Sequence, residues 1–303
     1  YGQEYAELAT RRGLLEVAVE ARITVEEVRE ALLTHGWDGE WFRRAFFDNG
    51  AALGSSANDE CKIDLIAQVW SVLSGASTDT FIQPAMQAMS QQLIDDEAGL
   101  LHLLAPPLEK SANNPGYIQA YPRGVRENGG QYSHAAVWAM MAQAQTGDAD
   151  AAWESFKALS PAHRSEHPTR GPVYELEPYV MAGDVYGSAP YVGRGGWSWY
   201  TGSAAWLYRA ALESILGLRI RRGVLSLSPC VPSGWPSFEI TIKLEGRQTI
   251  VRWEREDSQT LQGIEPHAVI APDEALTLAD LPDKATVLVR GVTKTSANAG
   301  AGS

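Results

Sequence analysis

The sequence predicts a mainly α-helical fold followed by a small antiparallel β domain. Apolar residues recur at helical spacing from Glu4 to Leu216, and after Gly217 the spacing changes to alternation of apolar and polar residues. The connections between the predicted helices alternate between short turns and long loops. This alternation is typical of an α/α toroid, because a plain helical bundle does not need loops of such length.

The chain opens inside an amphipathic pattern, which predicts one helix over Glu4–Arg22 and a second over Ile23–His35. Thr24 is the expected N-cap of the second helix, and Glu27 completes a capping box with it. Since the first residue is Tyr1 and the pattern is already in progress there, we expect the chain to be cut from something longer.

Five further helices follow, punctuated by glycine and proline. The apolar run Ile63–Gly75 ends on a glycine suited to a C-cap. In the next helix, at about Thr80–Leu93, Pro84 is compatible with helix only if it lies in the first turn. The remaining predicted helices are Ser133–Thr146, Ala149–Leu159 and Thr201–Leu216.

Strands are predicted beyond Gly217. Phe238–Leu244 and Thr249–Trp253 alternate apolar and polar residues, and Gly246-Arg247 between them is a predicted hairpin turn. Leu225–Ser228 and Thr286–Arg290 are further predicted strands. We therefore divide the chain into a partial helical domain at 1–220, a β domain at 221–291 and a disordered tail at 292–303.

Composition excludes several classes of protein. The 303 residues include 25 Lys and Arg against 37 Asp and Glu, and the net charge of −12 argues against binding of nucleic acid or of an anionic membrane. No apolar run reaches the ~20 residues that span a bilayer, and from the first residues, Tyr1–Tyr5, which carry neither a basic segment nor an apolar core, we expect no signal peptide. Cys61 and Cys230 are too few for a disulfide framework or a structural zinc site. We expect a cytoplasmic protein that uses no metal ion or cofactor.

Aromatic residues accompany glycine in the predicted loops, with 10 Trp and 11 Tyr beside 28 Gly. Indole faces stack on the apolar face of a pyranose, so this combination favours a carbohydrate site. Any single Trp is better explained as a core residue. The interpretation as a carbohydrate site therefore depends on the clustering of several aromatic residues in the loops.

Two glycine-containing loops enter predicted helices with chemically useful side chains, and a third segment pairs two carboxylates. A helix N-terminus offers free N–H groups and a positive dipole end, so both helix starts suit an anion. Taken singly, each feature has a simpler explanation, as turn glycines, ordinary N-caps, a packed histidine or solvated glutamates. Together they favour a site for a sugar and a phosphate. The residues concerned are Arg126, Glu127, Gln131 and His134 in the first loop, Trp197, Tyr200, Thr201, Gly202 and Ser203 in the second, and Glu175 and Glu177 in the third.

No P-loop, dinucleotide fingerprint, Gly-x-Ser-x-Gly elbow or His-Glu-x-x-His motif occurs. The sequence itself resembles the C-terminal half of the glycoside hydrolase family 94 catalytic domain. The resemblance rests on ENGGQYSHAAVW at 127–138 and GGWSWYTGSA at 195–204, and on shorter matches in order as far as Trp253. Within that family these two segments are most similar in sequence to the phosphorylase-like C-terminal domain of cyclic β-1,2-glucan synthases. Similar β-1,2-oligoglucan phosphorylases come next, followed by cellobiose and chitobiose phosphorylases.

The resemblance implies the second half of an (α/α)6 barrel and an inverting phosphorolysis. Inorganic phosphate attacks the anomeric carbon while an Asp protonates the glycosidic oxygen, and glucose 1-phosphate is released. Because phosphate is already an anionic nucleophile, no second carboxylate is needed as a base, in contrast to an inverting hydrolase. The expected partners are a β-glucan oligosaccharide, with β-1,2 linkage as the first expectation, and inorganic phosphate as co-substrate.

The resemblance also implies roles for individual residues. His134, Thr201 and Gly202 match phosphate-binding positions of the family, and Glu127 matches a carboxylate beside the sugars. By position in the same loops we add Ser203 and Arg126 to the phosphate-binding residues. We expect substrate contacts also from Gln131, Glu177, Trp197 and Tyr200. The glutamine that cellobiose phosphorylases carry after Glu-Pro-Tyr-Val has no counterpart in this chain.

The family's general-acid Asp lies in a Trp-Asn-Asp motif upstream of the matched region, and this chain has no such tripeptide. We therefore expect no catalytic acid here, the missing N-terminal half of the domain as a partner, and activity reduced roughly 10²–10⁴-fold or more. Two alternatives remain open, an inverting hydrolase with Glu127 or Glu177 as base and a non-catalytic glucan-binding remnant. We expect no nucleic acid and no direct membrane contact, although the chain would lie at the cytoplasmic side of the inner membrane within a cyclic glucan synthase. A homo-oligomer is compatible with the sequence.

Overall fold

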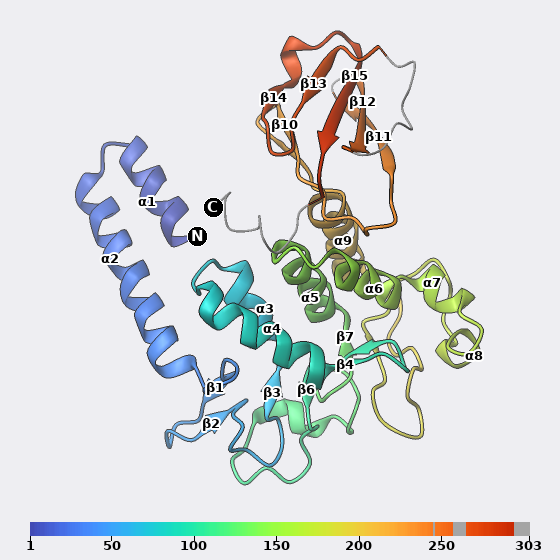
Figure 1. Cartoon of the computed structure of the whole chain (residues 1–303). Helices are drawn as coiled ribbons and strands as arrows, with labels where there is room; N and C mark the ends of the chain where they lie inside the picture. The colour runs from blue at the N-terminus through green and yellow to red at the C-terminus, as the bar shows by residue number, and fades with distance from the viewer. Residues whose placement is uncertain (245, 257–264, 294–303) are drawn as a thin grey trace. The chain divides into compact units, whose positions relative to one another are not determined.

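A computed structural model describes residues 1–244, 246–256 and 265–293 (Figure 1). The chain divides into two compact units, each described here by itself. Unit 1 comprises Tyr1–Gln131 and Gly187–Pro190, and unit 2 comprises Tyr132–Tyr186 and the chain from Tyr191 onwards. The described part is mainly helical up to residue 217 and rich in strands after it, as predicted.

Unit 1 begins with a helical hairpin of α1 (Gly2–Arg11) and α2 (Leu15–Ala31). The predicted boundary between Arg22 and Ile23 is therefore wrong. The chain turns instead at Gly13, whose φ of +74° is a conformation that suits glycine. Thr24 lies inside α2 and donates its hydroxyl to the Glu20 carbonyl at 3.0 Å, so it caps nothing. A π-helical turn, Leu32–Gly36, continues α2.

The rest of unit 1 is built on α3 (Leu65–Leu73) and α4 (Asp79–Leu93), joined to small two-stranded ladders. Asp64 begins α3 by accepting hydrogen bonds from the backbone N–H groups of Ile66 and Ala67. Pro84 lies in the second turn of α4, so its expected place in the first turn is wrong. The ladders pair β1 (Ala45–Phe46) with β2 (Ala52–Leu53), β3 (Ile63–Asp64) with β6 (Leu104–Ala105), and β4 (Ile94–Asp95) with β5 (Leu100–Leu101).

The core of unit 1 lies between α3, α4 and the β5–β6 segment, where apolar side chains are completely enclosed. Each such buried side chain contributes about 1.5–3 kcal/mol to the free energy of folding. The core is therefore a stable base for the loop that follows β6. That loop contains a 3-10 helix, Gly116–Ala120, and then the predicted site segment. The enclosed side chains include Ile63, Leu65, Val69, Met89, Leu93 and Leu100.

In unit 2, α5 (Ser133–Gln145) is the central helix, and α6 (Ala149–Leu159) and α9 (Thr201–Ala210) pack on it. Its many alanines allow this close approach, and most of its residues are buried. The predicted bounds of α6 and the predicted starts of α5 and α9 are confirmed. After Ala210 the helix continues as a π-helical turn, Ala211–Ile215. Shorter elements are α7 (Pro161–Glu166), α8 (Gly171–Tyr174), β7 (Gln131–Tyr132, beginning on the last residue of unit 1) and β8 (Asp184–Val185).

The strands after Gly217 form two sheets. The first has the order β14-β10-β9, from β9 (Leu218–Arg221), β10 (Val224–Leu227) and β14 (Leu276–Thr277). The second has the order β11-β12-β15-β13, from β11 (Ser237–Leu244), β12 (Arg247–Arg255), β13 (Ala268–Ile270) and β15 (Lys284–Gly291). A 3-10 turn, Leu278–Asp280, follows β14.

The prediction of an antiparallel β domain is wrong for the second sheet, which is mixed. The β11–β12 hairpin is antiparallel, as the Gly246 turn requires, but β15 pairs in parallel with both β12 and β13. The chain between Arg255 and Lys284 is long enough for the crossover that a parallel pair needs. Of the tail predicted at 292–303, Thr293 accepts a hydrogen bond from the Val231 N–H, and residues 294–303 lie outside the described part.

Candidate functional site

Unit 2 brings the starts of α5 and α9 together. The residues that precede the two helices, Tyr132 and Tyr200, share a hydrogen bond of 2.9 Å between their hydroxyl groups. The N–H of Ser133 donates to Gly183 and that of Tyr200 donates to Met181, both at 3.0 Å. Both helix starts are therefore tied to one short stretch of backbone and held in fixed geometry.

His134 lies directly against the first turn of α9. A Cβ atom placed on Gly202 would lie 3.0 Å from His134 Nε2, so a glycine at this position permits the close approach. The imidazole meets the Tyr200 ring edge to face, with centroids 5.4 Å apart. Thr201 and Gly202 are exposed at this helix start. Since the first N–H groups of a helix have no partner within it, the arrangement can bind an anion.

The protonation state of His134 follows from its surroundings. Partial burial lowers the pKa of this imidazole below its ordinary value of 6.5, because the charged form loses solvation. At neutral pH the ring is therefore mainly neutral. An anion bound beside Nε2 would favour the protonated form and raise the pKa again.

Ser203 has a different place from its neighbours. Its side chain is buried, and its hydroxyl donates to the Tyr200 carbonyl at 2.9 Å. The structure thus brings His134, Thr201 and Gly202 together at one open helix start, whereas the Ser203 hydroxyl is turned to the backbone. Sequence position alone did not distinguish these two orientations.

The first predicted loop, in unit 1, presents Arg126 and Glu127. Arg126 Nε lies 3.5 Å from Glu127 Oε2, and the guanidinium sits over the Tyr121 ring at 5.3 Å from its centroid. Arg126 has a φ of +50°, an unfavourable conformation for a residue with a side chain. Such backbone strain persists only where neighbouring contacts hold it, and it is typical of functional loops.

The contacts that hold this loop come from residues that the sequence analysis did not single out or assigned otherwise. Asn128 is completely buried, and its amide binds the N–H and carbonyl of Leu108 and the carbonyl of Tyr121 at 2.7–2.8 Å. Gln131, expected to contact substrate, is also buried, and its Oε1 accepts from the Leu101 N–H at 3.0 Å. An Asn-Gly-Gly run in a long loop is the signal that could have identified Asn128 as a structural amide.

The remaining predicted substrate residues lie in two loops of unit 2. Trp197 is 69% exposed, Tyr200 packs against His134, and Glu177 is half-buried. Glu175 forms an ion pair of 3.1 Å with Arg194, which joins the two loops. Trp197 is therefore displayed to solvent on a loop that an ion pair links to its neighbour, whereas Tyr200 is half-buried.

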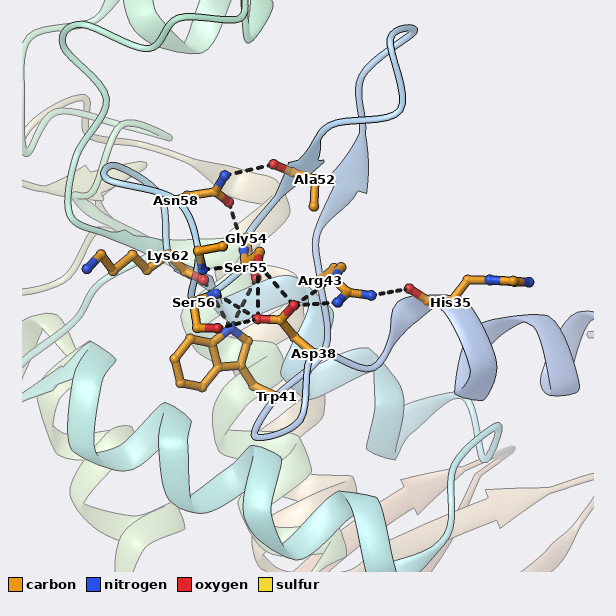
Figure 2. A network of polar contacts seen from close by, with 11 residues as sticks. His35, Asp38, Trp41, Arg43, Ala52, Gly54, Ser55, Ser56, Asn58 and Lys62 are labelled. Carbon is orange, nitrogen blue, oxygen red and sulfur yellow. Dashed lines mark hydrogen bonds and ion pairs between the residues drawn. The ribbon is translucent and has the colours of Figure 1, made fainter.

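A polar network in unit 1 was also missed from the sequence (Figure 2). The Asp38 carboxylate accepts hydrogen bonds from the Arg43 guanidinium, the Ser55 hydroxyl, and the backbone N–H and hydroxyl of Ser56. Burial acts to raise the pKa of Asp38, but the hydrogen bonds from Ser56, Ser55 and Arg43 outweigh it and hold the pKa below 3.8. Asp38 therefore remains ionised and cannot act as a general acid near neutral pH.

Asp64 of unit 1 carries a buried carboxylate. Burial raises the pKa of Asp64 to about 6, against the opposing effect of Arg44 at 3.5 Å. Its Oδ1 caps α3 and its other oxygen faces Arg44, so its hydrogen-bonding capacity serves the fold. Within the described ranges, no group of three or more His, Cys, Asp or Glu is arranged to hold a metal ion. None of the helices described is both long and apolar enough to cross a membrane.

Comparison with known proteins gives the family to which this chain belongs. The model of the glycosyl hydrolase 94 superfamily catalytic domain matches residues 1–217. The model of the glycosyl hydrolase family 65 C-terminal domain matches residues 218–278. The chain therefore belongs to the glycosyl hydrolase 94 superfamily.

Among individual proteins, the chain is 46% identical over 222 residues to the cyclic beta-(1,2)-glucan synthase NdvB of Rhizobium meliloti (strain 1021), covering 73% of this chain and 8% of that protein. It is 32% identical over 234 residues to the N,N'-diacetylchitobiose phosphorylase of Vibrio proteolyticus, covering 76% and 28%. It is 30% identical over 228 residues to the solabiose phosphorylase of Paenibacillus borealis, covering 74% and 28%. The chain thus spans less than a third of the length of each of these relatives.

Proposed function

We propose that this chain carries the phosphate-binding part of an inverting phosphorylase that cleaves β-linked glucan, with β-1,2-glucan as substrate. The observation that supports this most is the position of His134 against the first turn of α9, beside Thr201 and Gly202. An imidazole, a hydroxyl and free backbone N–H groups at one helix start form a set of donors suited to a phosphate.

The chemistry needs a held nucleophile rather than a second carboxylate. A phosphate oxygen forms a bond to the anomeric carbon, the glycosidic C–O bond breaks, and the departing oxygen takes a proton from a general acid. In this proposal His134, Thr201 and the Gly202 N–H, all in unit 2, hold the phosphate. Since phosphate itself attacks, the reaction uses no cofactor.

We further propose that the general acid belongs to a part of the catalytic domain outside this chain. Asp38 is held ionised and Asp64 is engaged as a helix cap, so neither suits the role. The relatives named above are more than three times as long as the region they share with this chain, which leaves room for the acid and for the other half of an (α/α)6 barrel.

The experiment is the release of glucose 1-phosphate from linear β-1,2-glucan, in this chain and in a chain extended upstream through the rest of the catalytic domain. We expect phosphate-dependent release from the extended chain only, lost in His134→Asn. Phosphate-independent release of glucose would overturn the proposal in favour of a hydrolase. Glucan binding without any release in the extended chain would favour a binding remnant.

A further inference from the structure

Two aromatic side chains of unit 2 are left open to solvent beside the proposed phosphate site. Tyr179 is 76% exposed and Trp199 is 64% exposed, although large aromatic residues are usually mostly buried. Their rings are 6.4 Å apart between centroids, with an angle of 75° between the ring planes. The pair, called the Tyr179–Trp199 corner below, therefore displays two nearly perpendicular faces.

The corner is held in place by its backbone. Trp199 has a φ of +59°, a left-handed conformation that is a genuine outlier for so bulky a residue. Hydrogen bonds on both sides of it hold this conformation, since the Trp197 carbonyl accepts from Gly183 N–H and the Tyr200 N–H donates to Met181. The ion pair between Glu175 and Arg194 links the two loops that carry the rings. An exposed aromatic pair on a strained but anchored backbone is typical of a binding surface.

The position of the corner indicates which ligand it would bind. Trp199 lies two residues before Thr201, so the corner adjoins the helix start proposed to hold the phosphate. A group bound at the corner would be a neighbour of the reacting sugar. Aromatic rings bind the apolar face of a pyranose, and the polar tips of Tyr and Trp can bind its hydroxyl groups.

The angle between the rings bears on the linkage. In a β-1,4-linked glucan, successive rings form a flat ribbon, which stacks on aromatic faces that lie in one plane. A β-1,2 linkage joins adjacent carbons of a ring, so that successive rings turn sharply. Perpendicular aromatic faces match the turned chain and leave one ring of a flat chain without a platform.

We propose that the Tyr179–Trp199 corner is an outer sugar subsite that binds β-1,2-linked glucosyl units beyond the cleavage point and so sets the preference for chain length and linkage. This inference rests on the proposed function for the identity of the reacting sugar. It concerns different residues from those proposed to bind phosphate, so the two can fail separately.

The test is calorimetric titration of this chain with linear gluco-oligosaccharides of two and six glucosyl units. One series has β-1,2 linkages and the other has β-1,4 linkages. The variants are Tyr179→Ala and Trp199→Gly, because glycine accepts the left-handed backbone at position 199 without strain. Loss of one aromatic contact is expected to weaken binding of the β-1,2 hexasaccharide about tenfold. Binding of the disaccharide is expected to stay within about twofold.

The matched control is Tyr208→Ala, which removes an aromatic ring of similar exposure, 69%, from α9. We expect it to bind like the parent chain. Equal binding of the hexasaccharide by all variants, equal affinity for the two linkages, or no hexasaccharide binding at all would each overturn the subsite. Inorganic phosphate binding is measured in parallel. If the chain fails to bind phosphate but the hexasaccharide still depends on the corner, the proposed function fails and the subsite stands.

Discussion

Gly202 matters for what its missing side chain permits. A Cβ at this position would lie 3.0 Å from His134 Nε2, so the close contact of the imidazole with the first turn of α9 depends on this residue. The polypeptide conformation at Gly202 is ordinary helix, which any residue can adopt. Its role is therefore steric, so a substitution at this position tests the contact with His134 directly.

We expect Gly202→Ala to weaken phosphate binding by tenfold or more, because the methyl group displaces the imidazole and covers the free N–H groups of the first turn. The protein should remain folded, because the helical backbone at position 202 accepts alanine without strain and the neighbour that must move is a side chain. Calorimetric titration with phosphate measures the first effect and thermal unfolding the second. Gly234→Ala is the control, because nothing lies within 4 Å of a Cβ at that position. Unchanged phosphate affinity in Gly202→Ala would contradict the proposed site.

The titration of His134 gives a second prediction. Its pKa is lowered by partial burial in the free protein, and a bound dianion should raise it. Binding of a dianion should therefore weaken as the pH rises through the pKa of His134 in the complex. Sulfate keeps its charge between pH 5 and 8, so its affinity isolates the histidine. We expect the affinity to fall over this range in the parent chain and to be nearly flat in His134→Asn. The same slope in both proteins would exclude His134 as the group responsible.

Asp64 carries a third prediction, on stability. Burial raises the pKa of Asp64 from 3.8 to about 6. Between these two pH values the folded protein keeps the Asp64 carboxyl protonated, whereas the unfolded chain has released that proton. The stability contributed by this group therefore decreases as the pH rises from about 4 to 6, by roughly 2–3 kcal/mol. Asp64→Asn keeps the N-cap acceptor and removes the buried charge.

Urea unfolding at pH 4, 5, 6 and 7 checks this expectation. The Asn variant should be more stable than the parent at pH 7, and the gain should shrink towards pH 4. Asp148→Asn is the matched control, because Asp148 caps α6 from an exposed position where no charge is buried. A gain that is constant over the whole pH range would show that the charge is not its source.

At the scale of elements, the site loop of unit 1 depends on one buried amide. Asn128 binds two segments of loop backbone through three hydrogen bonds and lies two residues after Arg126, whose backbone is strained. Asn128→Ala leaves the backbone groups of Leu108 and Tyr121 buried without these partners, which should cost about 3 kcal/mol of unfolding free energy. Asn114→Ala, at an exposed turn, should cost less than about 0.5 kcal/mol. Equal costs for the two variants in urea unfolding would mean that the Asn128 bonds contribute nothing specific.

The helices were predictable where apolar periodicity and punctuation agreed. Thus α6 was located to the residue, because Gly147-Asp148 marks its start and Leu159 ends the apolar pattern. The turn between α1 and α2 was missed because the apolar pattern continues past Gly13, and a glycine alone does not fix a boundary. Two-residue strands such as β3 and β6 are too short to have a period, so they were not predicted.

At the scale of the whole molecule, the sequence indicated the order of helical and β regions but not how the last strands pair. Alternation tells which face of a strand is buried and says nothing of the direction of its neighbour. The site was predicted in the same partial way. Loop position and the family resemblance singled out His134, Thr201 and Gly202, which lie close together in the structure, and their role stays a prediction. The burial of Gln131 and the support from Asn128 follow from contacts between residues far apart in the chain.

The parallel placement of β15 has a consequence for synthesis of the chain. Because β15 lies between β12 and β13, a ribosome must release residues 284–291 before β12 gains its second neighbour and before β13 gains its first. Until then the edge of β12 that β15 later covers stays open and is a template for pairing with another nascent chain. A chaperone that covers this edge during translation should increase the yield of folded protein. A chain that ends before Lys284 should aggregate even though residues 1–217 are present.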